Sequence, residues 1–175
     1  MLEGIALALM KTLATYLFKT YVLSQSVVKI EGAPSWYLQN VESQVCVYDY
    51  EQGGMEAIDK AKDATYPKME KELSGIIEAV IYEGYSDLKD PKEKKFVMMF
   101  KNDPDAPVFV RKNMTFPGIE YRKKDQAAFV KACIDKDVII DYQQKRTEKI
   151  KYELTHLRAD NAFDELDKSA EPAKQ

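Results

Sequence analysis

The apolar positions along this chain recur with two spacings, and each spacing predicts a type of secondary structure. Steps of three and four residues between apolar side chains predict helices over residues 55–77 and 136–163. Asp135 or Asp137 can cap the second helix. Pro67 lies inside the first helix and removes one backbone donor, so we expect a kink there or two consecutive helices.

Runs of β-branched and aromatic residues predict a sheet. The predicted strands cover residues 45–50, 78–85, 96–100, 108–110, 119–122 and 126–134. The segment between 96–100 and 108–110 is rich in Asp and Pro, as turns are, so these two strands predict a hairpin. The expected fold class is α+β, an antiparallel or mixed sheet of about four to five strands with two long helices packed on one face.

The first 28 residues hold the densest apolar stretch of the chain. Lys11 and Lys19 interrupt it, whereas a membrane-spanning helix needs about 20 mostly apolar residues. A secretory signal would carry basic residues ahead of the apolar run, and here the only charge before Lys11 is Glu3. On a helical projection the polar residues form one narrow stripe, so residues 1–31 are predicted to be an amphipathic helix and its linker.

The wide apolar face of that helix needs a partner. It can pack on its own domain, on a partner helix or on a membrane surface, and a span or an atypical signal is a further alternative. The candidate partner-contact residues are Leu9, Leu13, Leu17, Phe18, Tyr21 and Trp36.

A Gly- and Pro-containing segment, residues 32–35, marks the boundary of the main domain. We expect an α+β domain over 32–163 and a disordered tail over 164–175, where the sequence is acidic and then rich in Ala, Pro and Lys. Trp36 directly follows the boundary. A tryptophan at this place usually pins the incoming chain to the core, and a binding-surface role is the alternative.

The two cysteines, Cys46 and Cys133, both lie in predicted strands. Their separation excludes the spacing of a CxxC redox or zinc motif. They can be two small buried residues, or a disulfide that joins neighbouring strands in an oxidising compartment. A nucleophilic thiol is disfavoured, because neither local sequence supplies a base or a helix N-terminus.

Charge and motif content exclude several classes of function. The net charge is −3, whereas nucleic-acid-binding domains carry a basic excess. The only histidine, His156, lies in a charged helical stretch and gives no pair for a metal. Nucleotide-binding and hydrolase motifs are absent from the sequence. We expect no enzyme activity, cofactor or metal, and we interpret the acidic pairs (Glu70 with Glu72, Asp103 with Asp105) as surface and turn residues.

Several segments, in this order along the chain, carry a resemblance. They are Gly32-Ala33-Pro34-Ser35-Trp36-Tyr37, a strand, a helix with Ala57, Ala61 and Ala64, a hairpin, and Phe129-Val130-Lys131-Ala132-Cys133-Ile134-Asp135-Lys136 before a helix. This order is similar to the LPP20-like envelope lipoproteins, a family that includes the flagellar basal-disc protein of epsilonproteobacteria. The sequence differs from that family at residues 45–50, where a glycine-rich strand would stand, and in lacking a lipobox cysteine.

The wide apolar face of residues 5–23 and the absence of a catalytic constellation, together with this resemblance, predict a non-enzymatic structural or assembly protein of the bacterial cell envelope or flagellar motor. The protein is expected in the periplasm or at the outer membrane, and the cytoplasm stays open as an alternative. Its partners would be copies of itself or other envelope proteins, and a membrane surface is a further candidate. Two alternatives stay open from the residues: a small-molecule-binding or catalytic α+β domain, and a membrane-surface protein that binds through residues 1–28.

Overall fold

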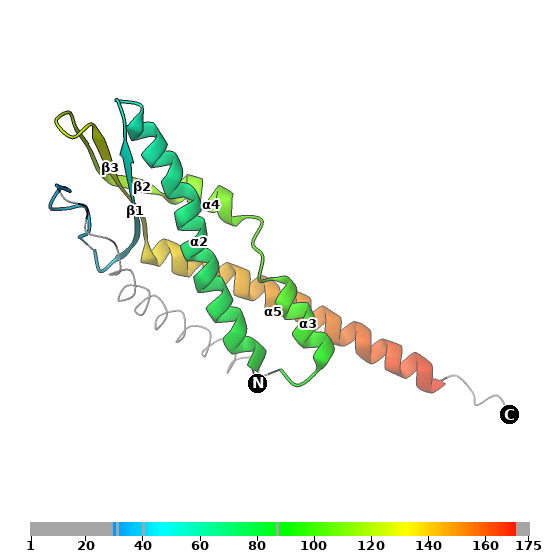
Figure 1. Ribbon diagram of the computed structural model, residues 1–175. Coiled ribbons are helices and arrows are strands. Elements are labelled where there is room, and N and C mark those ends of the chain that lie inside the picture. Colours follow the sequence, from blue (N-terminus) through cyan, green and yellow to red (C-terminus); the bar gives the residue numbers. More distant parts are fainter. Residues whose placement is uncertain (1–29, 31, 40, 87, 171–175) are drawn as a thin grey trace.

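The computed structural model describes residues 30, 32–39, 41–86 and 88–170 (Figure 1). The predicted N-terminal amphipathic helix lies almost entirely outside these residues. The described elements, in chain order, are β1 (Gln44–Gln52), α2 (Ala57–Ser86), α3 (Pro91–Met99), α4 (Ala106–Asn113), β2 (Thr115–Arg122), β3 (Ala127–Asp135) and α5 (Lys136–Ala170).

The sheet has three antiparallel strands in the order β1-β3-β2. β3 is therefore the central strand, and eight of its nine residues are buried. The α+β class is as predicted, but a sheet of four or five strands with two long helices is wrong. In the described part of the chain, three strands are accompanied by the four helices α2 to α5.

The strand predicted over residues 78–85 is the C-terminal part of α2. Here Ile77 and Ile81 are buried on one helical turn, whereas Tyr82 is half exposed. A short apolar run fits a buried helix as well as a buried strand, which explains the error. The helix also continues through Pro67 as one element, so the alternative of two consecutive helices is wrong.

The hairpin predicted over residues 96–110 consists of two helices, α3 and α4. Asp90 caps α3, since its side chain accepts a hydrogen bond from the Lys92 amide at 2.8 Å, and Pro91 takes the first helical position. Pro107 lies in the first turn of α4 in the same way. Proline is favoured at the start of a helix because its missing N–H would have no intrahelical partner there.

One face of the sheet packs against α2. Ala57 and Ala61 near the start of α2 meet Ala128 and Val130 of β3. Small side chains at four-residue spacing let the helix come close to the strand. Farther along α2, the larger core residues Met69, Leu73 and Ile76 pack with β1, β3, α4 and the start of α5.

A second core lies away from the sheet, among α2, α3 and α5. Its buried residues are Ile77, Ile81, Leu88, Val97 and Leu154. Ile81 and Val97 come from segments predicted as strands, and Leu154 comes from the middle of α5. The molecule is therefore a sheet domain extended by a helical layer, and Figure 1 shows α5 crossing α2 and continuing past α3 in that layer.

α5 begins directly after β3, at Lys136, and runs for 35 residues. The Lys136 amide donates a hydrogen bond to the Ser43 carbonyl oxygen at 2.8 Å, which ties this junction to the start of β1. The helix continues through Ala170, so the part of the predicted disordered tail from 164 to 170 is helical instead. Its last turns extend beyond α2 and α3 (Figure 1). Residues 171–175 lie outside the described residues.

Candidate functional site

The second face of the sheet carries a cluster of aromatic side chains. Tyr37 is buried, and its ring lies edge-on to Phe129 with 5.2 Å between centroids and to Tyr48 with 5.6 Å. Tyr37 belongs to the segment before β1, which packs here together with Trp36 and Leu38. This segment therefore packs on the face of the sheet opposite to the face that packs against α2.

Trp36, one of the predicted partner-contact residues, lies against β2. A Cβ atom built on Gly118 would come within 2.5 Å of the indole ring, so the ring occupies the space that any larger residue needs. Trp36 is half-buried, and its ring is edge-on to Tyr37 at 6.1 Å. It thus joins the segment before β1 to the sheet, which is the anchoring arrangement that the sequence predicts.

We expect Gly118→Ala to lower the free energy of unfolding by about 1–3 kcal/mol, because the new methyl group must displace the Trp36 ring. Gly54→Ala is the matched control, since there the Cβ meets only the flexible Glu56 carboxylate, and its effect should stay within about 0.5 kcal/mol. Urea denaturation of the two variants measures the difference. Equal stability of both variants would contradict a close Trp36–Gly118 contact.

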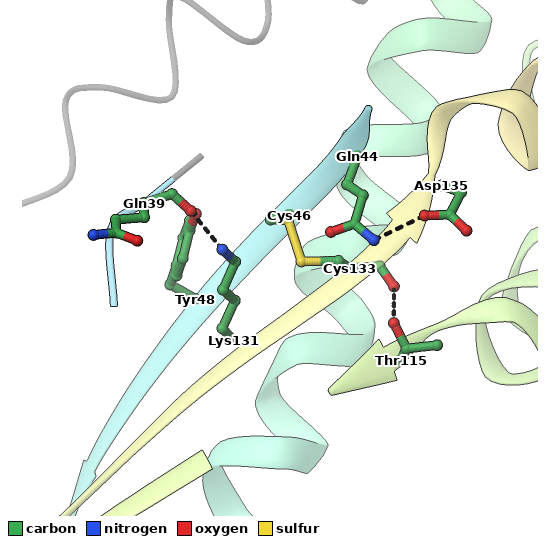
Figure 2. The surroundings of a disulfide bond; sticks show 8 residues. All are labelled: Gln39, Gln44, Cys46, Tyr48, Thr115, Lys131, Cys133 and Asp135. Carbon is green, nitrogen blue, oxygen red and sulfur yellow. Dashed lines mark hydrogen bonds between the residues drawn. A yellow bond between two sulfur atoms is a disulfide. The ribbon is translucent and has the colours of Figure 1, made fainter. Parts of the chain in front are cut away.

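Cys46 and Cys133 form a disulfide across β1 and β3 (Figure 2). The two residues face each other directly in the antiparallel register. Of the interpretations left open by the sequence, the disulfide between neighbouring strands is therefore confirmed. A nucleophilic cysteine is excluded in this state, because both sulfur atoms are bonded.

Polar side chains flank the disulfide on the same face (Figure 2). On one side, Gln44 Nε2 donates a hydrogen bond to Asp135 Oδ1 at 2.8 Å. On the other side, the Lys131 ammonium group donates to the Gln39 carbonyl oxygen, which also accepts from the Tyr48 hydroxyl at 3.0 Å. Lys131 is buried, and burial lowers the pKa of its ammonium group. The two bonds to the Gln39 carbonyl oxygen hold the segment before β1 on the sheet.

We expect the protein to lose stability as the pH rises above about 10, the ordinary pKa of a tyrosine phenol. Burial raises the pKa of Tyr37, with the charge of Asp49 adding to the effect, and burial followed by a hydrogen bond to Asp103 raises the pKa of Tyr142. A raised pKa in the folded state stabilises the protein while the phenol stays neutral, and this stabilisation disappears as the unfolded chain begins to ionise.

Urea denaturation between pH 8 and pH 12 measures this loss. Tyr37→Phe removes one of the two phenols, so its stability should fall less steeply with pH than that of the natural chain. Tyr152→Phe is the control, because Tyr152 is 66% exposed and should leave the pH dependence unchanged. A Tyr37→Phe profile parallel to that of the natural chain would contradict the prediction.

Two ion pairs hold α5 to the rest of the molecule. Arg146 lies 3.1 Å from Asp103, a nearly buried carboxylate that also accepts the Tyr142 hydroxyl at 2.6 Å. About three turns farther along α5, the Arg158 guanidinium donates two hydrogen bonds to the Glu93 carboxylate of α3, at 2.6 and 2.7 Å. Asp103, predicted as a turn residue, therefore holds the first third of the helix.

The contacts of α5 with α3 extend to Asn161, which accepts a hydrogen bond from Lys92 at 3.4 Å. The large apolar side chains of Phe163 and Leu166 are 67% and 63% exposed. Tyr152 is similarly exposed on the same helix, and its ring lies 4.5 Å from that of His156. Periodicity missed these residues, because the expected apolar stripe of this helix was the inner one through Ile150, Leu154 and Leu157.

The other predicted partner-contact residues, Leu9, Leu13, Leu17, Phe18 and Tyr21, lie outside the described residues. Within the described ranges, no cluster of three or more His, Cys, Asp or Glu side chains is arranged to hold a metal ion. Among the described helices, none combines the length and the apolar character needed to cross a membrane.

Comparison of the chain with models of protein families found no match, and neither did comparison with curated proteins or with solved structures.

Proposed function

We propose that this chain is a non-enzymatic assembly protein of the bacterial cell envelope or flagellar motor, acting through protein–protein contacts. The observation that carries the proposal is the outer side of α5, where Tyr152, Phe163 and Leu166 are each more than 60% exposed. Large apolar side chains gathered on one exposed element are typical of a protein-binding surface. The two short motifs that resemble the LPP20-like family, over residues 32–37 and 129–136, favour the same class.

The Cys46–Cys133 disulfide supports a location in the periplasm or at the outer membrane. Structural disulfides persist in oxidising compartments and are rare in a reducing cytoplasm. A disulfide in the central part of a sheet also suits a protein whose role is to keep a fixed shape under load.

Cell fractionation in a bacterium that naturally makes the protein tests the proposal. We expect the chain to sediment with the envelope, with both cysteines oxidised, in an assembly several times larger than its own mass of 20.1 kDa. A cytoplasmic monomer with two free thiols would contradict it. A variant lacking residues 1–28, compared by light scattering, measures how much of the assembly depends on the N-terminal segment.

A further inference from the structure

From Ile150 onward, α5 has two opposite apolar faces. The inner face, with Ile150, Leu154 and Leu157, packs into the helical core. Phe163 lies nine positions after Leu154, and at 100° per residue this places it half a turn away from the inner face. The outer face is therefore separate from the core that holds the helix.

The outer face forms a regular stripe. We define the outer stripe as Tyr152, His156, Ala159, Phe163 and Leu166, all of which are exposed. Their spacing alternates between four and three residues, the repeat by which one helix packs along another. The stripe is about 21 Å long, enough for four helical turns of contact. Its end lies on the part of α5 that extends beyond α2 and α3 (Figure 1).

The charges beside the outer stripe indicate the partner. Between Ala159 and Leu166 the helix carries Asp160, Asp164 and Glu165, all exposed, and no basic residue. Glu153 flanks the stripe about two turns before Asp160. In helix pairs the residues that flank the seam choose the partner by charge, and opposite charges are favoured.

A second copy of the same helix fits this surface poorly. Antiparallel pairing would set the flanking acids, Glu153 and Asp160, against the same residues of the other copy. Parallel pairing would set Glu148 against Glu153, again a like-charge pair. Neither arrangement gives any of these acids a basic partner. A helix with Lys or Arg beside its apolar seam would place a basic residue opposite each of them.

We propose that the outer stripe of α5 docks an amphipathic helix of another protein, one whose apolar seam is flanked by basic residues. This inference rests on the proposed function and names the surface and the chemistry of the partner. The apolar seam supplies most of the affinity, and the flanking acids select basic over acidic partners.

Binding of designed peptides to the full chain tests the inference. The probe is a labelled peptide of three heptads with Leu at the seam and Lys at the flanking positions. One comparison peptide has Glu at the flanking positions, and another has the residues of the probe in scrambled order. By fluorescence anisotropy at 0.15 M salt, we expect the probe to bind at least 10-fold more tightly than either comparison peptide. Equal binding of all three would overturn the proposal.

Two variants assign the binding to the stripe. Phe163→Asp should weaken probe binding at least 10-fold, while Val108→Asp, at an equally exposed apolar residue on α4, should leave it unchanged. Replacing Asp160, Asp164 and Glu165 together with Lys should reverse the preference toward the Glu-flanked peptide. Because these residues are exposed, circular dichroism should show the fold of each variant unchanged.

Three further results of the binding and oligomer measurements would overturn the proposal. They are unchanged probe binding by Phe163→Asp, an unchanged preference in the triple Lys variant, or a dimer of the natural chain that Phe163→Asp converts to a monomer. The last result would assign the stripe to a second copy. An envelope assembly that persists in Phe163→Asp would overturn this inference while leaving the proposed function intact, so the two failures are distinguishable.

Discussion

Replacing Cys46 and Cys133 together with alanine is expected to lower the free energy of unfolding by about 2–5 kcal/mol. The bond spans 87 positions of sequence, and closing so long a loop removes much of the conformational freedom of the unfolded chain. The expected effect therefore lies toward the upper end of that range. Urea denaturation without reducing agent measures it.

Reducing agent supplies the control for this prediction. It should destabilise the natural chain by nearly as much as the double substitution does, and it should leave the double variant unchanged. If the natural chain and the double variant unfold at the same urea concentration without reductant, the disulfide does not contribute to stability. Alkylation before and after reduction reports independently whether the two sulfur atoms are bonded.

Phe129→Ala is the single substitution in the sheet domain from which we expect a comparable loss, about 3–5 kcal/mol. Phe129 is only 2% exposed, and its ring lies 5.2 Å from that of Tyr37 and 5.0 Å from that of Tyr50. Truncation leaves a cavity between the central strand and the segment before β1. The segment should therefore become accessible to protease at residues 32–39 before the rest of the molecule unfolds.

Phe163→Ala is the matched control, since it removes the same ring from a position that is 67% exposed. Its effect on stability should stay within about 0.5 kcal/mol. Urea denaturation and limited proteolysis of the two variants give the comparison. A loss of stability with Phe163→Ala as large as that with Phe129→Ala would contradict the exposure described for the end of α5.

The sequence pattern predicts the elements of the sheet domain well. The strands predicted over 45–50 and 126–134 correspond to β1 and β3, the 119–122 prediction falls within β2, and the two long helices begin near their predicted positions. In these segments the apolar spacing, the turn residues and the strand-forming residues all agree. An element can be predicted from the sequence when its local preferences agree with its place in the whole fold.

The helical layer could not be predicted in the same way. Residues 96–100 form an apolar run too short to show a helical period, and only the fold reveals that Val97 is buried while Met99 is 62% exposed. The useful signal was the proline at each helix start, Pro91 and Pro107. Proline in the first helical turn after an aspartate predicts a helix as readily as a turn.

The candidate sites show a different limit. The pairing of Cys46 with Cys133 depends on the register between β1 and β3, which no local pattern specifies. The sequence did not predict the outer stripe of α5 for another reason. Its exposed aromatic residues become meaningful only once the inner face of the same helix is seen to be occupied.

The direct continuation of β3 into α5 has a mechanical consequence. Since no connecting residue separates Asp135 from Lys136, the helix is a lever about 50 Å long that is clamped at the sheet. A pull on its far end reaches the central strand, which is hydrogen-bonded on both sides and covalently joined to β1 at Cys133. The strand that receives the tension is thus the one least able to slide.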